Sequence, residues 1–250
     1  MTVADIVLLC GAALAGGIVN SIAGGGSLLL FPALVATGLG PVAANVTNAV
    51  ALWPGYVGTL FGLGPLVHEQ ARRARELGLA ACIGAAAGCA LLLSTPGEAF
   101  DVLVPFLVIG ASLLVAAQPA IARRIGGEHE SHPRELVIAV GIGAVYGGYF
   151  GGGLGVILLA VIGLTLAVPL RETNALKSIL SVFIATVSLI AFAAFGPVHW
   201  TEVAIAAPTA LIGGVLGGRL AASVNERALR IAIVVLGLGV GAWLAVRAFA

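Results

Sequence analysis

Two glycine triplets interrupt otherwise apolar sequence, and both could bind an anion through the main chain. Residues 24–26 lie in NSIAGGGSLLLFPAL, and residues 151–153 lie in YGGYFGGGLGVILLAVIG. Each triplet would end one helix and start another, short one. The first N–H groups of a helix have no partner within the helix, and that end carries a partial positive charge. Because glycine has no side chain, a ligand can approach such a backbone closely. The alternative is that the glycines only allow close helix packing.

Four polar side chains extend this hypothesis. Ser27 is expected to cap the helix that follows the first triplet, and the second triplet has no equivalent serine. Asn48 and Asn174 open later segments, and their amides could donate to an anion or to a neighbouring helix. Lys177, one turn after Asn174, could attract an anion to the cytoplasmic side or could extend to the membrane interface.

The apolar segments lack several residue types, and this limits the ligands and reactions that they could support. All 11 acidic residues fall at segment ends or in connectors. Cation carriers and carboxylate-based proton relays usually need an acidic residue inside the membrane. The segments also contain no nucleophile–base set, no paired carboxylates and no metal-ligand motif. We therefore expect an anion or a neutral molecule as the ligand, no enzymatic activity and no cofactor or metal.

The composition indicates the class of protein that carries these motifs. Hydrophobic residues make up 60 % of the chain and charged residues 9 %, whereas soluble domains have about 25 % charged residues. This predicts an all-α polytopic membrane protein with the lipid bilayer as a partner, and a net charge of +1 offers no surface for nucleic acid. The ten predicted apolar segments are residues 5–22, 27–40, 43–63, 76–94, 100–119, 135–150, 154–168, 173–195, 201–222 and 227–248.

The second five segments repeat the first five in the same order. The glycine triplets, the Thr–Asn pairs at 47–48 and 173–174, and the sequences GPLVH and GPVH recur in that order. At one constant spacing, Gly84, Gly88, Leu91 and Ser94 correspond to Gly213, Gly217, Leu220 and Ser223. An internal duplication follows, with a first membrane repeat at 1–119, a cytoplasmic linker at 120–134 and a second repeat at 135–250.

The positions of the charges predict that the second repeat is inverted. If all ten segments cross and the N-terminus lies outside, 11 of the 12 basic residues fall on the cytoplasmic side, as the positive-inside rule requires. Inverted repeats with broken helices are typical of transporters with a substrate site near the middle of the membrane. In the alternative topology the short glycine segments are re-entrant, which would place Arg171, Lys177, Arg227 and Arg230 outside.

These motifs resemble the TauE/SafE family of sulfite exporter-like membrane proteins. The stretch from NSIAGGGSLLLF to VTNAVAL and its repeat from GGYFGGGLGV to ETNALKSIL carry the resemblance. It implies a secondary transporter of small sulfur-containing anions, such as sulfite, sulfoacetate or related organic sulfonates, in a bacterial or archaeal inner membrane. An anion channel and a non-transporting membrane subunit are the alternatives. A proton or sodium as coupling ion, and a homo-oligomer, stay open. The predicted substrate-binding residues are Gly24, Gly25, Gly26, Ser27, Asn48, Gly151, Gly152, Gly153, Asn174 and Lys177.

Overall fold

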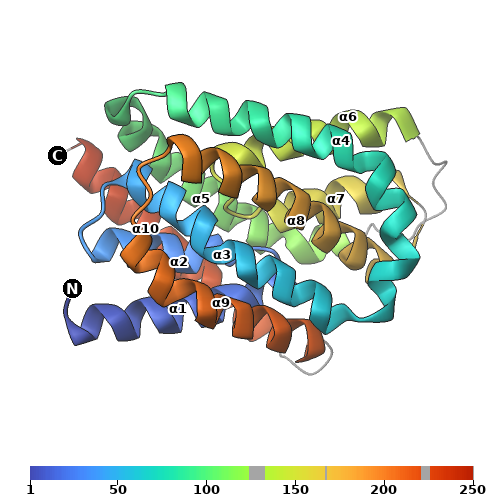
Figure 1. Ribbon diagram of the computed structural model, residues 1–250, viewed down its shortest axis with the longest axis horizontal. Coiled ribbons are helices and arrows are strands. Elements are labelled where there is room, and N and C mark those ends of the chain that lie inside the picture. The colour runs from blue at the N-terminus through green and yellow to red at the C-terminus, as the bar shows by residue number, and fades with distance from the viewer. Residues whose placement is uncertain (124–132, 167, 221–225, 250) are drawn as a thin grey trace.

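The computed structural model describes residues 1–123, 133–166, 168–220 and 226–249, and these form ten α-helices and no strand. The helices lie side by side along the long axis, and both termini lie at the same end of the bundle (Figure 1). The ten predicted segments are thereby confirmed as helices. The helices are α1 (Val3–Ile22), α2 (Ser27–Ala36), α3 (Pro41–Leu63), α4 (Pro65–Ser94), α5 (Gly97–Ala122), α6 (Pro133–Tyr149), α7 (Leu154–Thr165), α8 (Leu170–Phe195), α9 (Trp200–Leu220) and α10 (Glu226–Phe249).

Six of the described helices are long and apolar enough to cross a membrane, namely α1, α4, α5, α8, α9 and α10. Large apolar side chains on the outside of the bundle, such as Leu79 and Phe195, are 72 % and 81 % exposed. Such exposure is costly in water and favourable in lipid. The chain is therefore a multi-pass membrane protein. The two helices that follow the glycine triplets are short, with 10 residues in α2 and 12 in α7, or roughly 15–18 Å.

Two predicted helix boundaries are wrong, each for a local reason. Residues 64–75, which fall between two predicted segments, mostly belong to α4, which begins at Pro65 and has 30 residues. Hydropathy detects the membrane and not the helix, and this polar stretch is rich in good helix formers. The segment expected to run to residue 40 ends as α2 at Ala36, because Gly38 adopts a φ of 98° that stops the helix.

Helices of the first half of the chain pack against helices of the second half. Helix α4 packs against α6 and α8, helix α9 packs against α1 and α3, and α5 packs against α10. The matched glycines make these contacts: a Cβ at Gly88 would clash with α6 at Val145, and a Cβ at Gly217 would lie 2.7 Å from the Ile18 oxygen of α1. At these positions the glycines serve close helix packing. The predicted match at Ser223 lies outside the described residues.

Candidate functional site

The first glycine triplet joins α1 to α2 with a different cap from the one predicted. Gly24 has a φ of 81°, which favours glycine, and its N–H donates to the Val19 oxygen to close α1. The N-cap of α2 is Gly26, so Ser27 does not cap the helix and instead begins it. The Gly26 N–H donates to the side-chain oxygen of Asn20 at 2.7 Å. An asparagine of α1 thus replaces the expected serine cap, and it lies before the triplet because the chain turns back there.

The second glycine triplet joins α6 to α7 in a similar turn. Gly151 and Gly153 have φ values of 75° and 72°, and Gly153 is the N-cap of α7. The hydroxyl of Tyr146 donates to the Gly152 oxygen at 2.6 Å, which fixes the turn against α6. Both triplets therefore end one helix and start a short one, as predicted.

The two turns touch each other, backbone to backbone. The N–H of Gly155 donates to the Gly24 oxygen at 3.3 Å. A Cβ at Gly24 would lie 2.7 Å from the Gly155 carbonyl carbon, inside any tolerable contact. Glycine is needed here for close approach, which the packing interpretation predicts for this residue.

A small cavity, the central cavity, lies beside these turns. It has a volume of about 20 Å³, enough for a water molecule or a small ion. Its polar lining groups belong to Ser27, Asn48, Tyr56, Gly151 and Ser188. Asn48 is 1 % exposed, and its amide oxygen has no hydrogen-bond partner among the described residues. The fold thus brings together three of the predicted residues, Ser27, Asn48 and Gly151, from α2, α3 and the turn before α7.

Lys177 does not extend to the membrane interface, which rules out the snorkelling alternative. Its side chain is buried, with 1 % of the residue exposed, and Nζ donates to the main-chain oxygen of Asn20 at 3.2 Å. No described carboxylate forms an ion pair with it. Along α8, Lys177 lies three residues after Asn174 and seven before Ile184, so the three share one face of the helix. Ile184 lines the central cavity.

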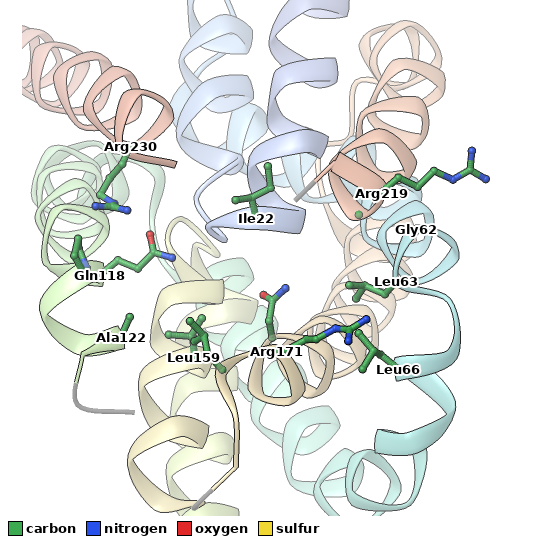
Figure 2. A pocket seen from close by; sticks show the side chains of 14 residues that line it. Ile22, Gly62, Leu63, Leu66, Gln118, Ala122, Leu159, Arg171, Arg219 and Arg230 are labelled. Atoms are coloured by element: carbon green, nitrogen blue, oxygen red, sulfur yellow. The ribbon is translucent and has the colours of Figure 1, made fainter. Parts of the chain in front are cut away.

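Asn174 lines a second and much larger cavity, which we call the vestibule (Figure 2). It has a volume of about 810 Å³ and lies where α3, α5 and α9 end and α8 and α10 begin. None of the described residues that line it is acidic. The polar residues of its wall are Gln118, Arg171, Asn174, Arg219 and Arg230. An anion that enters the vestibule meets positive charge, and Lys177 lies one turn along α8 from Asn174.

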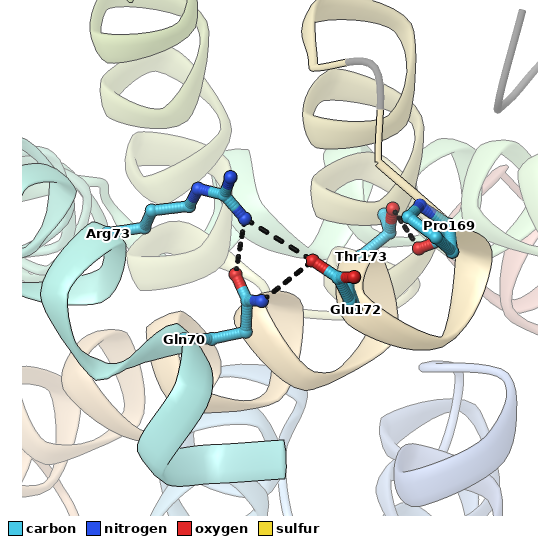
Figure 3. A network of polar contacts seen from close by, with 5 residues as sticks. All are labelled: Gln70, Arg73, Pro169, Glu172 and Thr173. Carbon is cyan, nitrogen blue, oxygen red and sulfur yellow. Dashed lines mark hydrogen bonds and ion pairs between the residues drawn. The ribbon is translucent and has the colours of Figure 1, made fainter.

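A polar network lies beside the vestibule. Arg171 and Glu172 are neighbours in the chain, but the Glu172 carboxylate turns to α4 (Figure 3). The Glu172 carboxylate accepts a hydrogen bond from the Gln70 amide at 3.0 Å and lies 3.4 Å from the Arg73 guanidinium. Arg73 also donates to the Gln70 oxygen at 3.0 Å. We call these three residues the α4–α8 clamp.

Comparison with known proteins identifies the relatives of this fold. A sequence model of the family described as sulfite exporter TauE/SafE matches residues 8–244. The chain belongs to the TauE/SafE family.

The known relatives of this TauE/SafE chain are described as probable membrane transporter proteins. YfcA of Escherichia coli strain K12 is 25 % identical over 230 residues, which cover 90 % of this chain and 83 % of YfcA. A Haemophilus influenzae protein is 24 % identical over 225 residues, covering 87 % and 86 %. The Sinorhizobium protein ORF9 is 30 % identical over 159 residues, covering 58 % of this chain and 55 % of ORF9. No solved structure matches the chain.

Sequence reasoning about this TauE/SafE protein missed three polar residues near the site. Asn20 accepts from Gly26 and supplies the oxygen that holds Lys177. The side chain of Tyr56 lies near those of Ser27 and Asn20, and Gln118 lines the vestibule. All three are polar residues within apolar segments, which is a signal for function in membrane helices. That signal could have found them.

Proposed function

We propose that this protein is a secondary transporter that moves small sulfur-containing anions, such as sulfite, sulfoacetate or related organic sulfonates, by alternating access. The observation that carries the proposal is the buried ammonium of Lys177, which lies between the basic vestibule and the central cavity. A buried charge is costly unless an opposite charge compensates for it. A transported anion supplies that charge, and membership in the TauE/SafE family supplies the sulfur-containing class.

The glycine turns support main-chain contacts to the same anion. Helices α2 and α7 both begin at the central cavity, so their partial positive charges favour a negative ligand there. The N–H groups of Gly25 and Ser27 form no hydrogen bond with a described residue. In this proposal Ser27, Asn48 and Gly151 bind at the cavity, Asn174 at the vestibule and Lys177 between them, whereas the N–H groups of Gly24 and Gly26 already donate to Val19 and Asn20.

The asymmetry of the cavities favours a carrier over a channel. The vestibule has a volume of about 810 Å³ and the central cavity only about 20 Å³, and one wall of the central cavity is the ring of Phe150, which packs against Phe31 with 5.7 Å between the ring centroids. One turn from Asn48, the Asn45 amide donates to the Tyr149 oxygen at 2.9 Å. A channel needs a continuous path, while a carrier closes one side when the other is open.

The inverted arrangement of the repeats is part of the same proposal. Residues 1–119 and 135–250 would form two five-helix units, joined by the linker 120–134, most of which lies outside the described residues. The exchanged packing of α4 and α9 supports a two-fold relation between the units. Alternating access then follows from a movement of one unit relative to the other around the central cavity.

The transport proposal is tested by flux measurements with purified protein in liposomes. We expect uptake of labelled sulfite or sulfoacetate that saturates with concentration and that accelerates when a proton or sodium gradient is imposed. Uptake that rises linearly with concentration and ignores both gradients would favour the anion channel. Flux no greater than that of empty liposomes would contradict transport and favour the membrane subunit.

The proposed orientation is tested by labelling single cysteines in intact cells, after Cys10, Cys82 and Cys89 are replaced. We expect an impermeant thiol reagent to label a cysteine at Pro197 and to leave one at Arg72 unlabelled until the membrane is opened. Arg72 suits the test because its side chain is 86 % exposed. Labelling of position 72 in intact cells would reverse the orientation and with it the cytoplasmic location of the vestibule.

A further inference from the structure

The charged side chains among the described residues in the wall of the vestibule are all arginines, so they are positively charged hydrogen-bond donors. Its arginines carry only donors, and in Figure 2 the Gln118 amide extends from α5 into the same space as Arg230. Gln118 is 8 % exposed, and its amide oxygen has no hydrogen-bond partner among the described residues. The three arginines suit an oxyanion, which offers several acceptors. The Gln118 oxygen is itself an acceptor, so it would take a hydrogen bond from a donor and not from an oxyanion.

The carboxylate that follows Arg171 in the chain does not pair with it. Glu172 follows Arg171 directly in the chain, and its carboxylate would compete with any anion for the Arg171 guanidinium. The α4–α8 clamp instead holds that carboxylate between Gln70 and Arg73 (Figure 3). Arg171 forms no ion pair with any described carboxylate.

We propose that the vestibule is a second anion-binding site, separate from Lys177, in which Arg171 holds an oxyanion before it moves deeper, and that Gln70 and Arg73 are positioning residues that keep Glu172 away from it. The proposal builds on the proposed anion transport. The volume of about 810 Å³ exceeds the needs of an inorganic ion and lies in the range of pockets for organic ligands. The site therefore takes oxyanions that carry an organic body, such as alkyl sulfonates.

The site is tested by calorimetric binding of ethanesulfonate to the full-length protein in lipid nanodiscs. The Lys177→Met variant, which removes the deeper cation, is expected to keep one ethanesulfonate site. Adding Arg171→Gln to that variant should weaken this binding about 10- to 100-fold, the effect of losing a charged hydrogen bond. Loss of all ethanesulfonate binding in the Lys177→Met variant would overturn the second site. The proposed transport function is tested separately, by flux through the unmodified protein.

The positioning role is tested with a matched pair of arginines on α4. Arg73→Gln should release Glu172 toward Arg171 and weaken ethanesulfonate binding about threefold, a modest effect because the pair is partly exposed. Adding Glu172→Gln should restore the affinity, since no carboxylate then remains to compete. Arg72→Gln removes the same charge one residue earlier, from a pair with Glu76 at 3.3 Å, and should leave binding unchanged. Equal weakening by both arginine variants, without rescue by Glu172→Gln, would show a general charge effect and overturn the positioning role.

Discussion

Replacing Lys177 by methionine is expected to abolish saturable anion uptake without destabilising the protein. The ammonium is buried and has no carboxylate partner among the described residues, so the anion loses its deepest positive charge. Removing one partner of a buried, hydrogen-bonded charge pair costs about 2–5 kcal/mol of binding, or at least roughly 30-fold in affinity. Methionine has a similar length and no charge to desolvate, so the melting temperature should stay the same or rise.

The stability measurement separates the binding role from a structural one. If Lys177 served only to hold the Asn20 oxygen at the end of α1, the methionine variant would melt at a lower temperature and the surviving protein would bind anions normally. Arg247→Gln provides the control for net charge, because Arg247 lies at the opposite end of the bundle, over the Trp243 ring. This control should transport like the unmodified protein. Normal affinity in a Lys177→Met protein would remove Lys177 from the binding site.

The helices could be predicted because apolar length is a local property of the chain. Each apolar run and each glycine triplet marks a helix or a turn without knowledge of its neighbours, and all ten segments formed helices. The start of α4 was missed because a helix can leave the membrane without ending, so that hydropathy falls while the backbone hydrogen bonds continue. The duplication predicted which glycines are equivalent, such as Gly88 and Gly217, but not that each contacts the other half of the chain.

The site could be predicted only where one motif defines it. The triplets and Asn48 were identified from their types and their repetition, whereas the environment of Lys177 depends on the rotation of α8. A helix that is apolar on most sides does not indicate which face is buried. The pairing of Glu172 with Arg73, 99 residues earlier, depends on how α4 lies across α8. Sequence proximity favoured Arg171 instead, and tertiary packing determined the observed pair.

Substitution of Gly24 by alanine is expected to cause a large loss of stability. Gly24 has a φ of 81°, which costs an alanine about 1–2 kcal/mol, and the new Cβ would meet the backbone of Gly155, at a further cost of about 1–3 kcal/mol. Gly25→Ala is the matched control in the same turn. Its Cβ would meet the side chains of Val115, Ile233 and Leu28, at 3.1, 3.7 and 3.9 Å, which can adjust. We expect Gly25→Ala to fold and Gly24→Ala to yield little folded protein, as measured by melting temperature and by the monodisperse fraction.

A third variant separates strain in the backbone from the clash between the two turns. Gly155→Ala would create the same close contact from the other side, but Gly155 lies within α7 and has no positive φ. Gly155→Ala should therefore lose less stability than Gly24→Ala, by about 1–2 kcal/mol, which is the cost of placing an alanine at a positive φ. The double variant should be less destabilised than the sum of the two, because both alanines clash at one contact. Strictly additive losses of stability, or a Gly24→Ala protein that melts like the unmodified one, would mean that the two turns do not touch. The glycines would then need another explanation. Anion binding by the Gly25→Ala variant would decide whether the main chain forms the site.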